Sequence, residues 1–163
     1  LKSVLLLMWD KAKDFLERAF TVIFVATLII WFLQTFDTRL NVVTDSSASL
    51  LALVGQWLSP VFAPLGFGDW RAVTALISGF IAKESVISTL GILLGGASLS
   101  GLFTMHSAVS FLLFTLLYTP CVAAVSAIRR ELRSGWGAAG VAAMQCGIAW
   151  LVSFLVYQLI ALL

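Results

Sequence analysis

The stretch "FLLFTLLYTPCVAAVSAIRRELR", residues 111–133, begins as an apolar run and has a proline and a cysteine near its middle. Pro120 has no N–H, so the carbonyl of Leu116 loses the donor that a continuous helix would supply. In lipid such a carbonyl needs another partner: a neighbouring helix, a hydroxyl such as that of Thr119, water or a bound cation. The stretch therefore predicts a membrane helix broken at Pro120, with the Cys121 thiol beside the break.

The composition of the whole chain is that of a membrane protein. Of 163 residues, 61% are hydrophobic and 11% are charged, with a mean hydropathy of +1.05, whereas soluble domains contain about 25% charged residues. We expect an all-α, polytopic helical membrane protein with at least one broken or re-entrant helix. The net charge of +2 is too small to indicate a nucleic-acid partner. Two cysteines in apolar segments do not indicate a disulfide framework. The chain starts with Leu and lacks a signal-peptide pattern, so we expect it to be part of a longer protein.

Charged residues divide the chain into segments. Residues 1–19 place apolar side chains on one helical face and charged ones on the other, which predicts an amphipathic interfacial helix. Residues 20–36 are uncharged and, at about 1.5 Å per residue, are long enough for a transmembrane helix. We expect residues 20–163 to form the transmembrane domain.

The apolar segment 46–68 contains two prolines and three glycines. This pattern is typical of a discontinuous or re-entrant helix, and an interfacial helix followed by a proline-rich loop is the alternative. Residues 70–94, 107–128 and 136–163 are each long enough to span. Basic residues gather near the N-terminus and at positions 129, 130 and 133, so both places are expected on the cytoplasmic side. An even number of crossings must then lie between them, which favours a crossing by the proline-containing segment.

Lys83 and Glu84 interrupt an apolar segment. Charges inside a membrane are rare and usually face a cavity or a partner, so function is favoured over a purely structural pairing with another helix. Neighbours on a helix point about 100° apart, so the two side chains do not simply pair with each other. His106, in a loop, is expected to be incidental as a metal ligand, and Met144 and Cys146 are expected to pack in the core.

Motifs for several other chemistries are absent from the sequence. There is no G-x-x-x-x-G-K-[ST], His-Glu-x-x-His, Cys-x-x-Cys or G-x-S-x-G. A membrane-embedded thiol enzyme with Cys121 as nucleophile and a structural membrane subunit remain alternatives. The first needs a base that its own apolar segment lacks, and the second does not explain the charged pair and the proline. A transporter or channel explains both.

Two stretches resemble a known family. "GFGDWRAVTALISGFIAKESVISTLGIL" (residues 66–93) and "LLYTPCVAAVSAIRREL" (residues 116–132) are similar to the second gate region of the bacterial ferrous iron transport protein B family. The resemblance implies a gate-type, multi-pass permease for Fe(II) in the bacterial inner membrane. It also implies a GTPase domain and a first gate region in the same polypeptide, outside this chain. No permanent cofactor is then expected: Fe(II) is the substrate, GTP acts only through the other domain, and the chain itself is not an enzyme. Expected partners are the lipid bilayer, a small cytosolic accessory protein and further copies of the chain.

On this interpretation Cys121 and Glu84 are predicted to bind the ion. The residues predicted to line or gate the path are Lys83, Ser85, Ser88, Tyr118 and Pro120. A thiol would favour Fe(II) over Mg(II) and Ca(II), which prefer hard oxygen ligands. The competing account is a proline kink that only shapes the helix bundle, with Cys121 as a small filler.

Overall fold

The computed structural model describes residues 2–43, 45–81, 83, 85–95, 98–118 and 121–162. Within these ranges eight side chains are outside the description: Lys2, Leu5, Asp14, Phe15, Arg18, Ala19, Val22 and Ala123. The described helices are α1 (Lys2–Thr35), α2 (Leu50–Phe62), α3 (Trp70–Gly79), α4 (Ser85–Leu94), α5 (Met105–Leu117), α6 (Val122–Leu132) and α7 (Gly135–Leu162). Short 3₁₀ turns cover Ser46–Ala48, Ala63–Leu65 and Leu99–Gly101. The predicted all-α class is confirmed for this part of the chain.

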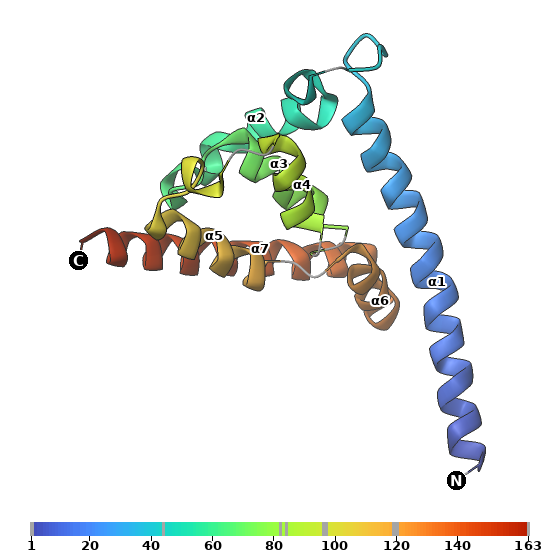
Figure 1. Ribbon diagram of the computed structural model, residues 1–163. Helices are drawn as coiled ribbons and strands as arrows, with labels where there is room; N and C mark the ends of the chain where they lie inside the picture. Colours follow the sequence, from blue (N-terminus) through green and yellow to red (C-terminus); the bar gives the residue numbers. More distant parts are fainter. Residues whose placement is uncertain are drawn as a thin grey trace.

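Helix α1 runs without interruption through residue 19, where we predicted the change from interfacial to transmembrane helix. It meets the rest of the molecule through α2 and α6, and its N-terminal part extends away from the other helices (Figure 1). Large apolar side chains on it, such as Leu16, Phe20 and Phe24, are exposed. The first two predicted segments are therefore one helix, and the membrane depth of its first half stays a prediction.

The segment with the two prolines forms a bent helix pair with the segment that follows. Pro60 lies inside α2, and the chain turns after it at Gly66, whose φ of 84° is left-handed. Residues Leu50–Leu65 and α3 meet at 102°. The two arms pack closely at Gly55, where a Cβ would lie 3.0 Å from the Trp70 carbonyl oxygen. This pair confirms the predicted broken helix.

Two segments predicted as single crossings are each two helices. Residues 70–94 form α3 and α4, and residues 107–128 fall in α5 and α6. In the second segment, Tyr118 leaves the helix with ψ 169°, two residues before the proline that cannot continue it. In the first, no proline is present, and the Lys83 side chain reaches carbonyl groups of α5 instead of remaining on an apolar helix surface. The prediction of one continuous helix was wrong for residues 70–94, whereas in residues 107–128 α5 ends at Leu117, close to the break predicted at Pro120.

Helix α7 is the clearest membrane element. It has 28 residues; its most apolar 18-residue window has a mean hydropathy of 1.8, and 11% of that window is buried. A helix in a soluble core would be mostly buried, so an apolar surface this open suits lipid. Among the described residues it alone is long and apolar enough to cross a membrane, and the bent pair makes a second crossing if it counts as one span.

An aromatic cluster holds α5 against the turn between α2 and α3. The rings of Phe62 and Phe114 meet edge to face at 5.3 Å, as do those of Phe67 and Phe111. On its other side α5 lies along α7 (Figure 1). Phe114 also stacks on Tyr118 at 5.5 Å, so the cluster fixes the place where α5 ends.

Candidate functional site

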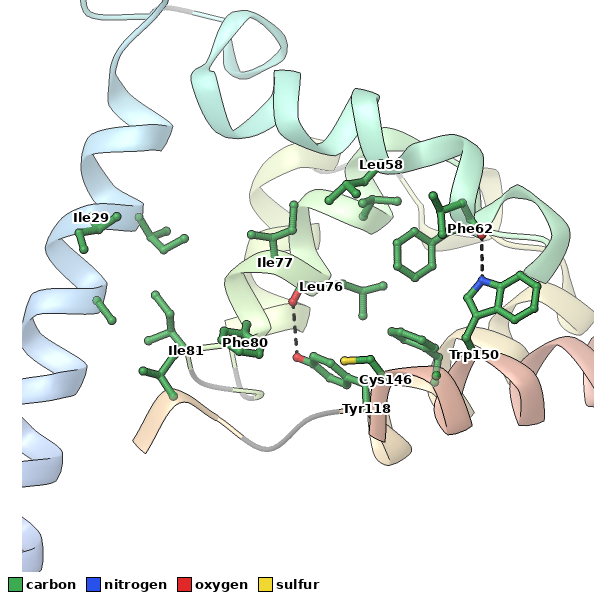
Figure 2. Close-up of a pocket in the computed structure, with 17 residues that line it drawn as sticks. Ile29, Leu58, Phe62, Leu76, Ile77, Phe80, Ile81, Tyr118, Cys146 and Trp150 are labelled. Atoms are coloured by element: carbon green, nitrogen blue, oxygen red, sulfur yellow. Dashed lines mark hydrogen bonds between the residues drawn. The ribbon is translucent and has the colours of Figure 1, made fainter. Parts of the chain in front are cut away.

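The breaks in the two interrupted segments lie against each other. The first break is the turn between α3 and α4, and the second is the turn between α5 and α6. The Val122 N–H donates to the Phe80 carbonyl at 3.0 Å. The Tyr118 hydroxyl donates to the Leu76 carbonyl at 3.4 Å, which Figure 2 shows as a dashed line. Main-chain groups of one break are therefore partners for the other, as backbone at membrane depth requires.

Lys83 of the first break reaches the second. Its Nζ lies 3.1 Å from the Thr115 carbonyl oxygen, 3.2 Å from that of Tyr118 and 3.4 Å from that of Leu116. It also lies 4.6 Å from the centre of the Tyr118 ring. Carbonyls in the last turn of a helix lack intrahelical donors and form its negative end, so they attract a cation.

Cys121 begins the helix on the other side of the second break. Its carbonyl accepts the N–H groups of Ala124 at 2.8 Å and Val125 at 3.1 Å, which starts α6. Its thiol is partly buried, is not in a disulfide and makes no capping bond.

A small polar pocket lies beside the first break. It measures about 170 Å³ and contains Ser85, one of the predicted lining residues. The Ser85 hydroxyl donates to the Ser78 carbonyl at 3.2 Å. The other polar side chains in the lining are Thr27, Gln34, Ser78 and Thr89. The predicted Ser88 is exposed and outside this lining. The sequence analysis missed these four residues, although hydroxyl and amide groups in apolar helices are a signal for such a pocket.

A larger, open cavity of about 730 Å³ is lined by α1, α2, α3 and α7 together with residues of both breaks (Figure 2). Of its lining side chains, three have polar atoms: Tyr118, Cys146 and Trp150. The Trp150 indole N–H donates to the Val61 carbonyl at 2.9 Å, and the Cys146 sulfur is directed towards Tyr118 in Figure 2. This surface cannot replace the water shell of a cation, and it suits hydrocarbon. Cys146 packs against the core, as expected, and also lines the cavity.

Two of the predicted site residues, Glu84 and Pro120, lie outside the described residues. Within the described part of the chain no three His, Cys, Asp or Glu side chains gather in a way that could hold a metal ion. The only histidine, His106, is exposed in the first turn of α5. Eleven further residues of α5, through Leu117, lie between it and the second break, and at 1.5 Å per residue that length is about 17 Å. No imidazole base therefore supports the thiol-enzyme alternative.

Comparison with known proteins relates this site to a family. Residues 16–135 match the family model Gate, described as nucleoside recognition. The chain is 37% identical over 156 residues to the Fe(2+) transporter FeoB of Staphylococcus aureus, covering 92% of this chain and 23% of that protein. It is 33% identical over 149 residues to FeoB of Methanocaldococcus jannaschii, covering 83% of this chain and 22% of that one.

A third relative is the Fe(2+) transport protein A/Fe(2+) transporter FeoB fusion protein of Porphyromonas gingivalis, 27% identical over 97% of this chain and 25% of its own length. The chain thus spans about a quarter of these curated relatives. No solved structure matches it. The chain belongs to the Gate (nucleoside recognition) family, and its similarity to FeoB over most of its length confirms the resemblance predicted from its two central stretches.

Proposed function

We propose that this chain forms part of the path by which Fe(II) crosses the bacterial inner membrane, as one region of a multi-pass FeoB-type transporter. The observation that supports it best is the contact between the two helix breaks, joined by the hydrogen bond from Val122 to Phe80. Helices interrupted at membrane depth present carbonyls and N–H groups to an ion, which continuous helices do not. The names of the FeoB relatives support ferrous iron as the ion.

The proposed ligands are the Cys121 thiol and the Glu84 carboxylate. Fe(II) is borderline in softness, so it accepts thiolate, carboxylate and carbonyl ligands together. Cys121 is the N-cap residue of α6 and follows Tyr118, whose carbonyl oxygen accepts from Lys83, by three positions in the chain. The polar pocket beside Ser85 would then lead to the breaks, with Ser88, Tyr118 and Lys83 along the path.

We also propose further partners for this chain. GTP hydrolysis is assigned to a GTPase domain elsewhere in the complete transporter, and this chain contributes no catalytic residue. The fusion of transport protein A with FeoB in one relative supports a small accessory protein as a partner. The same proposal includes the lipid bilayer, to which α7 exposes its apolar surface, and association between copies of the transporter.

The direct test measures uptake of radioactive Fe(II) by cells that produce the complete transporter with Cys121→Ala or Cys121→Ser. We expect both variants to lose at least tenfold in uptake at unchanged protein level. Cys146→Ala is the matched control, since that thiol lines the apolar cavity, and we expect it to transport iron normally. Hg(II) should block the wild type and not the Ser variant. Normal uptake by Cys121→Ala would remove Cys121 from the ion path.

The multi-pass part of the proposal has its own test. Because basic residues favour the cytoplasmic side, positions 13 and 134 should both face the cytoplasm. Single cysteines placed there, in a transporter without its native cysteines, should react with a maleimide only after the cells are opened. Reaction of either position with an impermeant reagent in intact cells would overturn the orientation.

A further inference from the structure

Among the described residues, the hydrogen bonds of the Lys83 ammonium group all go to main-chain oxygen atoms. Three carbonyls, those of Thr115, Leu116 and Tyr118, surround its Nζ at 3.1, 3.4 and 3.2 Å. The face of the Tyr118 ring lies on the same group at 4.6 Å, in the range of a cation–π contact. No carboxylate of the described residues forms an ion pair with this lysine.

Such a set of carbonyls is a site for cations in general. Main-chain carbonyls replace the water shell of ions in selective channels, and hard divalent ions take carbonyl oxygens as ligands. The three oxygens are available because they end a helix, and Pro120 has no N–H to give to that of Leu116. In the described part of the chain no three His, Cys, Asp or Glu side chains gather to hold a metal ion, so a cation bound there would depend on oxygen atoms such as these carbonyls.

We propose that the carbonyls of Thr115, Leu116 and Tyr118 form a binding site for the transported divalent cation, and that Lys83 is a tethered cation that fills this site while the ion is absent. The proposal rests on the proposed function in taking the ligand to be the transported ion. An ammonium and a metal ion repel each other strongly at this distance in a medium of low dielectric constant, so they exclude each other.

This exclusion couples binding to the shape of the breaks. Oxygen ligands lie about 2.0–2.6 Å from divalent ions, so the three carbonyl oxygens must move inward when a metal ion replaces the ammonium group. Lys83 belongs to the turn between α3 and α4, so its departure changes the contact between the two breaks. Entry of an ion would thus break the contact of Lys83 with the second break. When the ion is absent, this contact holds the two breaks together.

The simpler role for this lysine is to cap the end of α5, which also satisfies the carbonyls. The two roles differ in what a metal ion does after the ammonium is removed. The test uses the complete transporter in detergent, with Cys121→Ala added to every sample so that no thiol contributes. Mn(II), which is stable in air, is titrated while the unfolding temperature is measured.

Lys83→Met should lower the unfolding temperature, and Mn(II) should raise it again. The Mn(II) concentration needed for this rescue should be at least tenfold lower than the concentration that shifts the unfolding temperature of the protein with Lys83 in place. Lys83→Arg keeps the positive charge and should respond to Mn(II) as Lys83 does. A loss of stability in Lys83→Met that Mn(II) does not restore would leave Lys83 as a cap and overturn the proposal.

A second measurement leaves Lys83 in place and so does not depend on the folding of its variant. If a metal ion displaces the ammonium, Mn(II) should increase the reaction of Lys83 with an amine-specific acylating reagent, measured by peptide mass spectrometry. Lys13 on α1 is the internal control and should not change. Equal labelling of Lys83 with and without Mn(II) would overturn the proposal. Normal iron uptake by Cys121→Ala would not change the expected effects of Mn(II) on the unfolding temperature and on Lys83 labelling. The proposed function and the proposed cation site can therefore be refuted separately.

Discussion

Both helix breaks interrupt an apolar segment of the chain, but they have different causes. The second break contains Pro120, a residue that ends a helix by its own covalent structure. The first has no proline, and the Lys83 side chain there binds carbonyls more than thirty residues away along the chain. A break caused by backbone chemistry can therefore be predicted from sequence, whereas a break stabilised by a distant partner cannot.

The breaks also differ in what they present to an ion. The first supplies a positive charge at Lys83 and hydroxyl groups at Ser85 and Ser78. The second supplies carbonyl oxygens at the end of α5 and the thiol of Cys121. In the carbonyl site proposed for the transported cation, the second break would provide the oxygen ligands and Lys83 of the first break the competing charge, so neither break would form that site by itself.

The largest effect is expected from the carboxylate of the first break. Glu84→Gln removes a negative charge that would attract a cation, so iron uptake should fall at least tenfold with the protein level preserved. Glu131→Gln in the exposed end of α6 is the matched control and should transport normally. If protein level falls while uptake per molecule stays constant, Glu84 is an assembly partner instead.

Pro120→Ala should erase the cause of the second break. Alanine returns an N–H donor to the Leu116 carbonyl, so α5 and α6 can join, and we expect a several-fold loss of iron uptake. The Cys121 thiol should also change its reactivity with maleimide. Pro60→Ala is the control because that proline lies inside α2, away from both breaks. Unchanged uptake and thiol reactivity in Pro120→Ala would mean that tertiary contacts alone hold this break.

Gly79→Ala should separate the two breaks by crowding. A Cβ there would overlap Val86 and lie 2.7 Å from the Tyr118 hydroxyl oxygen. Overpacking of this kind lowers stability by about 1–3 kcal/mol, which thermal unfolding in detergent would detect. Gly91→Ala is the matched control: nothing lies within 4 Å of its Cβ position, and removing a helix glycine is worth about 0.5–1 kcal/mol. Equal stability of the two variants would show that the breaks are not in close contact.

The smallest effect is expected from Tyr118→Phe. It removes the hydrogen bond to the Leu76 carbonyl but keeps the ring beneath the Lys83 ammonium, so stability should fall by about 0.5–1.5 kcal/mol. The other tyrosine, Tyr157, is the control, because no hydrogen bond of its hydroxyl is found among the described residues. An equal change in both variants would mean that the bond between the breaks adds nothing.

The sequence by itself predicted the class of the protein, the family, the broken helix within residues 46–68 and an interruption of the segment that contains Pro120. These features depend on composition and on local backbone chemistry: apolar content, glycines and prolines within an apolar segment, and the missing N–H of proline. The membrane character of α7 follows from the same information, since its apolar residues surround the helix and are not gathered on one face.

Only the tertiary structure decided that residues 70–94 are two helices and that the partner of the Leu116 carbonyl is Lys83. Only it brought Thr27 and Gln34 of α1 to the pocket that contains Ser85. The Lys83 contact and the pocket each join residues more than thirty positions apart. A charge in an apolar segment shows that a partner must exist, because an unpaired charge is too unfavourable there. Which group serves as the partner depends on how the helices pack, and local sequence patterns do not contain that information.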